Sequence, residues 1–140
     1  MKYLLTMTIA ALFSLSIVAQ ADDLSERKIV MKSLNDYLKI LNAQKSDFNA
    51  DIVTKQATNV LAAFEKSQNL FKEKGTGETR ALDTIWTDKA GFSKALSNSI
   101  QAAQNLKSIG ENNQQNMYAD GFAQLGQSCG SCHRNYRARR

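Results

Sequence analysis

Hydrophobic residues recur at intervals of three and four along most of this chain, a spacing typical of amphipathic helices and not of strands. The chain has no proline and only seven glycines in 140 residues, so few positions interrupt a helix. Four periodic stretches are separated by polar or glycine-containing segments. We therefore predict an all-α protein, an antiparallel four-helix bundle with one hydrophobic core.

The first two predicted helices lie in the first half of the chain. One runs over about 24–42, with Asp23 or Ser25 as its N-cap, and the polar run after residue 42 ends it. The next begins after Asp51, a good N-cap residue, and continues over about 51–72. Both carry an apolar stripe of the width expected for a core-facing helix.

The other two predicted helices follow a long connection. Residues 73–84 contain two glycines and mixed charges, and this length lets the chain cross the end of a bundle. The third helix starts at residue 84 or 87 and runs to 108, and Gly110 is expected to stop it because glycine enters the left-handed conformation without steric cost. The fourth begins near residue 112 and continues toward the C-terminus.

The N-terminus has the pattern of a secretory signal peptide. Lys2 precedes an apolar run over 9–18, and Ala19-Gln20-Ala21 is a small-x-small cleavage site. The apolar run is shorter than the roughly 20 residues that span a bilayer, so we expect cleavage after Ala21 and no stable membrane anchor. Residues 1–21 are thus predicted to be removed and 22–140 to form the mature, periplasmic domain.

Composition adds a local cluster of positive charge. Removing 21 of 140 residues leaves 119, enough for one domain, and the formal charge falls from +5 to +4 with the loss of Lys2. Much of this charge lies in the last seven residues, which include four arginines: Arg134, Arg137, Arg139 and Arg140. No aromatic-interleaved basic stripe runs elsewhere, so we predict no nucleic acid. In an exported protein the expected uses of the cluster are contacts to haem propionates, helix-end electrostatics and docking to an acidic partner.

Candidate chemistry is concentrated in Cys129-Gly130-Ser131-Cys132-His133. Two thiols three residues apart, followed at once by an imidazole, form the c-type haem attachment pattern. On a helix the two thiols lie on one side and can both add to the vinyl groups of one porphyrin. His133 can then ligate the iron. In an oxidising compartment, thioether bonds to haem c would also consume two thiols that would otherwise pair.

Two other uses of these residues stay open on the motif alone. Cys-x-x-Cys is also the thiol-exchange motif, although that motif usually opens a helix after a strand and no strand pattern precedes it here. A closed zinc site wants four Cys or His ligands, and this chain offers two Cys and one His.

A helical chain with this motif near its C-terminus resembles the cytochrome c′ class, exported four-helix bundles with one covalent haem. Three stretches carry the likeness: Arg27-Lys28-Ile29-Val30-Met31, Ile85-Trp86-Thr87-Asp88-Lys89-Ala90-Gly91-Phe92, and Cys129-Gly130-Ser131-Cys132-His133-Arg134-Asn135-Tyr136-Arg137. The last is highly specific. The chain departs from the class in having no glycine after Met31, where members often carry one.

The resemblance implies a role for each of five residues. Cys129 and Cys132 are the thioether sites, and His133 is the proximal iron ligand. Arg137 is a basic group beside the haem, one helical turn beyond His133. Arg27 matches the first-helix arginine near the haem propionates.

Met31 matches the position that faces the distal side of the iron. In this class that position can hold a ligating methionine, in a low-spin electron carrier, or a side chain that only covers an open, five-coordinate iron. Taken alone, a methionine on an apolar helical stripe is usually core filler.

The function expected first is therefore the transfer of single electrons, with a periplasmic or membrane-bound redox protein as partner. The alternatives are binding of nitric oxide or carbon monoxide by five-coordinate iron, and a haem-free helical thiol or binding protein of the cell envelope. No general acid, nucleophile or substrate pocket can be named, so we do not predict an enzyme. Members of the class often dimerise, which makes a homodimer possible here.

Overall fold

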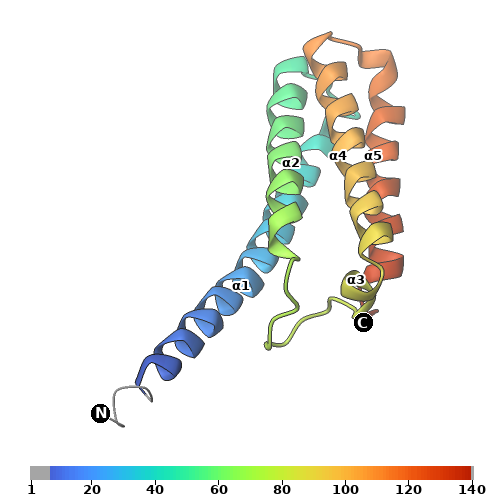
Figure 1. Ribbon diagram of the computed structural model, residues 1–140. Coiled ribbons are helices and arrows are strands. Elements are labelled where there is room, and N and C mark those ends of the chain that lie inside the picture. Colours follow the sequence, from blue (N-terminus) through green and yellow to red (C-terminus); the bar gives the residue numbers. More distant parts are fainter. Residues whose placement is uncertain (1–6, 140) are drawn as a thin grey trace.

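The computed structural model describes the backbone of residues 7–139 and the side chains of residues 23–139. Its helices are α1 (Met7–Ala43), α2 (Ala50–Leu70), α3 (Thr84–Thr87), α4 (Lys89–Glu111) and α5 (Gln115–Tyr136). The four long helices run alternately up and down in Figure 1. The described part of the chain contains no strand beyond one isolated bridge between residues 81 and 137, so the predicted all-α four-helix bundle is confirmed.

The first helix begins earlier than predicted. Asp23 and Ser25 lie inside α1 and cap nothing, because no glycine or proline separates them from Met7. None of the helices over residues 7–139 combines the length and the apolar character that crossing a bilayer requires. Residues 1–6 lie outside the described chain, and the expected cleavage after Ala21 stays a prediction.

Two helix starts also differ from the predicted ones. Asn49, and not Asp51, is the N-cap of α2: its extended backbone lets the side-chain oxygen accept a hydrogen bond from the N–H of Ile52 at 3.0 Å. The predicted third helix is broken at Asp88, whose carboxylate caps α4 by accepting from the N–H of Gly91 at 3.0 Å. The short α3 therefore precedes α4 as a separate turn.

Gly110 does not stop a helix. The prediction is wrong because α4 continues to Glu111 and the left-handed position falls on Asn113, with φ of 51°. Gly110 is buried where α4 crosses α2, and a β-carbon there would lie 2.7 Å from the backbone nitrogen of Thr54. This glycine serves close helix packing.

The core is built from neighbouring pairs of helices. α1 packs along α2, α2 along α4, and α4 along α5. Side chains from these four helices form one hydrophobic cluster, whose most deeply buried members are Leu41, Val53, Ala57, Val60, Ala103, Leu106 and Leu125. α1 and α5 close the bundle at one end only.

At that closed end α5 contacts the last turn of α1 and the turn that follows it. The Tyr118 hydroxyl donates to the carbonyl of Leu41 at 2.5 Å, and burial raises the pKa of Tyr118, so the hydroxyl stays a donor. The Lys45 ammonium lies 4.8 Å from the centre of the Phe122 ring. Toward the other end α1 and α5 diverge (Figure 1), which leaves room between them.

Removing the Tyr118 hydroxyl is expected to weaken the closed end. Tyr118→Phe removes one of the two hydrogen bonds that the carbonyl of Leu41 accepts and leaves the one from the N–H of Gln44, so the free energy of unfolding should fall by about 0.5 to 1.5 kcal/mol. Urea unfolding followed by circular dichroism measures this. Tyr37→Phe, which removes a hydroxyl from a half-buried ring of α1, is the control and should change the midpoint far less; equal effects would contradict the assignment.

Candidate haem site

The two thiols lie at the edge of the core on α5. Cys129 and Cys132 are half-buried and free, and Cys129 packs against the hydrophobic cluster. Burial raises the pKa of both thiols, and the neighbouring Cys129 raises that of Cys132 further. Both sulfurs are therefore held as neutral thiols on one side of the helix, where a single group can reach them.

The imidazole lies beside the thiols on the same helix. His133 follows Cys129 by four residues, and Gly126, Gly130 and His133 follow one another at four and three residues, so they lie on one side of α5. Arg137 is the C-cap residue after α5 and has an extended backbone. A β-carbon at Gly126 would meet nothing within 4 Å, and one at Gly130 would meet only the Arg134 guanidinium at 3.6 Å. The face below His133 is thus open, with room for a flat porphyrin next to the backbone.

The charge state of His133 suits metal binding. Burial lowers the pKa of His133, and the positive charges of Arg137 and Arg80 lower it further. The ring is accordingly neutral near physiological pH, which is the form that ligates a metal. Arg80 belongs to the connection after α2, and no periodic pattern in that segment predicts its place beside His133.

Met31 lies on a stripe of α1 that includes residues of the core. Leu24, Met31 and Leu38 are spaced by sevens on this helix, and Leu24 is buried and Leu38 half-buried. The carbonyl of Leu41 on α1 bonds Tyr118 on α5, so these two residues are at the same level of the bundle. Met31 lies ten residues before Leu41 on α1. On the antiparallel α5, Ser128 lies ten residues after Tyr118, directly before the motif. Met31 is therefore level with the motif. It is 38% exposed, so it is not core filler.

The guanidinium of Arg27 donates hydrogen bonds to main-chain carbonyls at the end of α2 and just after it. Arg27 is 5% exposed, and its guanidinium donates to the carbonyls of Leu70 at 2.6 Å, of Lys74 at 3.1 Å and of Glu73. The guanidinium carbon also lies 4.7 Å from the ring centre of Phe71. The structure therefore places this residue beside the motif end of the bundle with its donors directed to main-chain oxygens.

Aromatic rings line the motif end from the side of α2, α3 and α4. Phe92 makes edge contacts with Phe71 and with Tyr136, both at 5.2 Å between ring centres. Tyr136 also donates to the Asp88 carboxylate at 2.9 Å, and the Trp86 indole donates to the carbonyl of Phe71 at 3.0 Å. The sequence flagged Trp86 and Phe92, but the bond between Tyr136 and Asp88 joins positions 48 residues apart and left no local signal.

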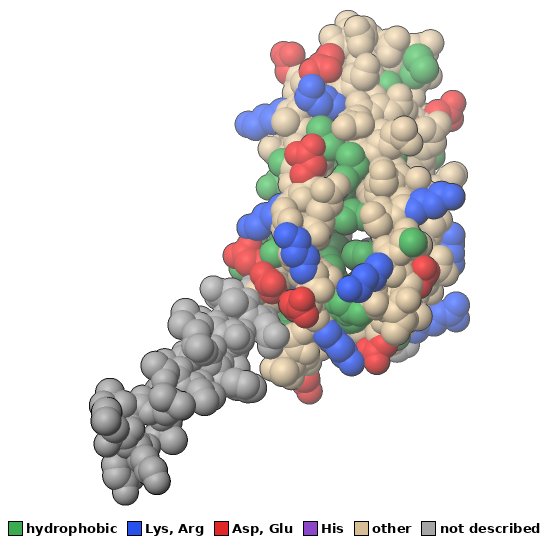
Figure 2. All heavy atoms as spheres, viewed as in Figure 1, with side chains coloured by type: hydrophobic (Ala, Val, Ile, Leu, Met, Phe, Trp, Pro, Cys, Tyr) green, Lys and Arg blue, Asp and Glu red, His purple; other side chains and the backbone are tan. Residues whose placement is uncertain are grey.

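The bundle is also open between α2 and α4. A cavity of about 540 Å³ lies there, with Phe71, Ile85, Phe92 and Leu96 in its lining and Lys72 and Lys89 among its polar residues. Figure 2 shows this face hollowed between α2 and α4, with hydrophobic side chains on the floor. Among the described residues, none of α5 lines this cavity, so it opens on the α2 and α4 side of the bundle, away from the thiols and the imidazole.

The C-terminal segment is fastened beside the site. Arg80 donates through two nitrogens to the carbonyl of Ala138, at 3.2 and 2.6 Å, and the N–H of Ala138 returns a bond to the carbonyl of Arg80 at 2.8 Å. This clip holds exposed Arg137 next to His133. Arg140 of the predicted cluster lies outside the described residues.

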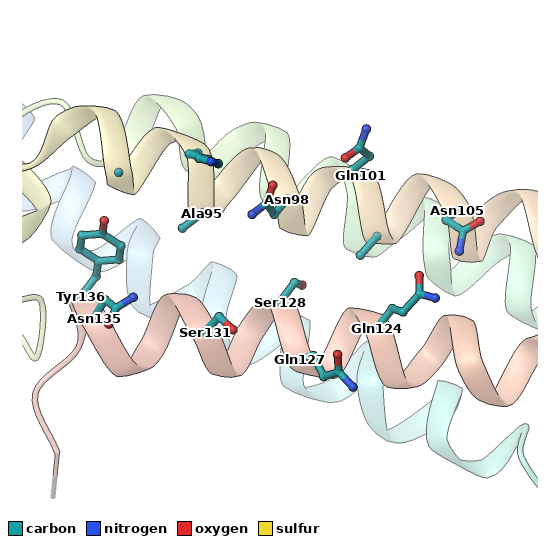
Figure 3. Close-up of a pocket in the computed structure, with 13 residues that line it drawn as sticks. Ala95, Asn98, Gln101, Asn105, Gln124, Gln127, Ser128, Ser131, Asn135 and Tyr136 are labelled. Atoms are coloured by element: carbon teal, nitrogen blue, oxygen red, sulfur yellow. The ribbon is translucent and has the colours of Figure 1, made fainter.

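A second groove, of about 610 Å³, runs along the outside of α4 and α5. Figure 3 shows its carboxamide side chains on the two helices: Asn98, Gln101, Asn105, Gln124, Gln127 and Asn135. Neither thiol and no imidazole lines it, so it is separate from the candidate site.

The other readings of the motif fit these residues less well. The cysteines form no disulfide. Within residues 7–139 no three or more Cys, His, Asp or Glu side chains are arranged to hold a metal ion by themselves, so a closed zinc site lacks ligands. The paired thiols, the neutral imidazole and the open glycine face together fit haem c.

Comparison with known proteins agrees. The chain is 30% identical to cytochrome c′ of Rhodopseudomonas palustris over 128 residues, 88% of this chain and 86% of the relative. Among solved structures, cytochrome c prime from Shewanella frigidimarina is 27% identical, with a TM-score of 0.78 over 86% of this chain and 97% of the other. A mutant cytochrome c prime from Alcaligenes xylosoxidans, solved as a nitric oxide complex, has the same fold (18% identity, TM-score 0.77, 86% and 97% covered).

The similarity to these proteins covers the whole candidate site. The family model described as Cytochrome C' matches residues 22–137, a span that contains Arg27, Met31 and the whole Cys-x-x-Cys-His motif. Proteins of this family carry covalently attached haem c, the group that the residues on α5 fit. The chain belongs to the cytochrome c′ family.

Proposed function

We propose that this protein carries single electrons through one haem c, and that His133 and Met31 are the residues that would ligate the iron. The observation that supports the proposal is the register of Met31: it lies ten residues before Leu41, whose carbonyl bonds Tyr118, and Ser128, just before the motif, lies ten residues after Tyr118. Met31 is also 38% exposed.

The bound haem iron supplies reversible one-electron chemistry, and a thioether ligand favours its reduced state. Cys129 and Cys132 fix the group by covalent bonds, so it is not lost on oxidation or reduction. His133 presents a neutral ring nitrogen. The aromatic side chains of Phe71, Phe92 and Tyr136 exclude water from the apolar part of the site.

Gas binding is the second candidate, and a specific observation favours it. The cavity between α2 and α4, about 540 Å³ in volume and partly lined by Phe71, Phe92 and Leu96, would give a small neutral molecule an entry from that side of the bundle. In that case Met31 covers the distal side without bonding the iron, and nitric oxide or carbon monoxide is the ligand. The relative solved with nitric oxide bound makes this the natural competitor.

Export from the cytoplasm is part of the proposal. The family match starts at residue 22, the residue that follows the predicted cleavage site after Ala21. A periplasmic location also suits the two thiols, because haem attachment protects them from oxidation to a disulfide.

The arginines around His133 form the proposed docking surface for an acidic redox partner. Among the described side chains all four ion pairs use lysines, whereas Arg134, Arg137 and Arg139 are exposed near the motif. Unpaired charge at this edge can steer an oppositely charged protein. The homodimer stays a prediction, and exposed Ile29 and Ile40 of α1 and Ile52 of α2 are the apolar side chains that such an interface would cover.

Covalent attachment should depend on both thiols. The double variant Cys129→Ser, Cys132→Ser, exported in a host with the haem attachment machinery, should give protein without acid-acetone-resistant haem. A haem stain on a denaturing gel reads this out. Ser131→Ala, which keeps both thiols, is the control and should stain like the native protein. Resistant haem in the double variant would overturn the assignment.

Met31→Ala tests the axial ligand. The native ferric spectrum should be low-spin, and the variant should become high-spin, lose reduction potential and bind carbon monoxide rapidly, because a soft ligand and a barrier are removed together. Met117→Ala, at another exposed methionine, should leave the spectrum unchanged. A native protein that is already high-spin and binds carbon monoxide quickly would favour gas binding instead.

Charge reversal tests the docking surface. With ferricyanide as an anionic probe, native oxidation should slow as salt rises, and Arg134→Glu should lower the rate at low salt by about two- to tenfold, since long-range attraction is lost. Lys55→Glu, the same charge change on α2 away from the motif, is the control. Stopped-flow kinetics measure both; equal effects would mean that net charge alone matters.

A further inference from the structure

The guanidinium of Arg27 joins three parts of the chain that are distant in sequence. Its bonds to Leu70, Glu73 and Lys74 cross 43 to 47 residues. Its carbon lies between two aromatic rings, 4.7 Å from the Phe71 centre and 5.6 Å from that of Trp86. One side chain of α1 therefore grips the last turn of α2, the residues after it and the start of α3.

The grip matches the physical chemistry of both partners. The last carbonyls of a helix have no intrahelical donor, and they form the negative end of the helix dipole. A planar guanidinium with five N–H donors can satisfy several of them at once while its faces stack on aromatic rings. Burial lowers the pKa of Arg27, and nearby Asp23 raises it, but a guanidinium stays charged at physiological pH.

Apolar packing of Leu24 and Val30 also fixes α1 against its neighbours at this level. The other polar link between α1 and α2 here is the Glu26–Lys66 ion pair, which is largely exposed and so contributes little. α1 has already diverged from α5 here (Figure 1). Met31 lies one helical turn after Arg27, on an adjacent part of the same helix surface.

We propose that Arg27 is a positioning residue: by bonding the carbonyl that ends α2 and two carbonyls of the turn after it, it holds α1 at a fixed separation from α5 and so sets how closely Met31 approaches the iron. The proposal rests on the electron-carrier function for its effect on ligation. It adds to the propionate contact expected from the sequence, because three of the five N–H donors bond Leu70, Glu73 and Lys74 and two are left for a further acceptor.

The test compares Arg27→Gln and Arg27→Lys with Glu26→Gln in the purified holoprotein. Glu26→Gln breaks the adjacent link between the same two helices and is the matched control. Hydrogen exchange followed by mass spectrometry reports on residues 70–75 and on α1. The ferric spectrum, the reduction potential and the carbon monoxide association rate report on the distal side.

The expected result has two parts. Arg27→Gln should speed exchange over residues 70–75 by about tenfold or more, because the turn loses several charge-assisted bonds. The same variant should lower the low-spin fraction and speed carbon monoxide binding. Arg27→Lys should recover only part of both effects, because an ammonium lacks the planar fork, and Glu26→Gln should change neither.

Two outcomes would overturn the proposal. Unchanged exchange over residues 70–75 in Arg27→Gln would show that Arg27 does not hold this turn. If the variant instead altered only the pH dependence of the reduction potential, with exchange unchanged, Arg27 would act on a haem propionate. A native protein that is high-spin would defeat the electron-carrier function without deciding this point, since exchange and carbon monoxide rates still report on α1.

Discussion

Joining α1 and α5 at one end only is the constraint on which the rest of the structure depends. The Tyr118 hydroxyl bond to Leu41 holds the two helices together there, and Lys45 of the turn after α1 contacts Phe122 of α5. The pairs α1 with α2 and α4 with α5 are each packed against one another. At the other end the two pairs separate. A helical bundle would ordinarily fill that space with side chains, and here the α5 face offers Gly126 and Gly130 instead.

At the end of the bundle where α1 and α5 separate, polar contacts help to keep the helices apart. Arg27 and the Trp86 indole satisfy main-chain oxygens at the end of α2, and Arg80 ties the connection after α2 to the C-terminal segment. These bonds fix three segments around the motif: the end of α2, the connection after it and the C-terminal segment. The motif is therefore framed by segments that are anchored to each other and not only by the hydrophobic core.

The glycines show why residue type alone did not assign roles. Gly110 and Gly121 allow close packing, since a β-carbon at Gly121 would lie 2.5 Å from the Ile109 side chain. Gly126 has open space around it. Gly110 was expected to end a helix and does not. In the sequence these glycines cannot be told apart. The role of each depends on whether a neighbouring helix packs against it.

By itself the sequence determined the helical class, the bundle and the attachment motif, because 3.6-residue periodicity and a five-residue spacing are local properties of the chain. Helix boundaries were less certain: capping by Asn49 and Asp88 depends on backbone angles that composition does not specify. Only the tertiary structure decided three further features: the hydrogen-bond partners of Arg27, the register of Met31 relative to the motif, and the position of Arg80 beside His133. Each depends on contacts between segments more than 40 residues apart, which no local pattern encodes.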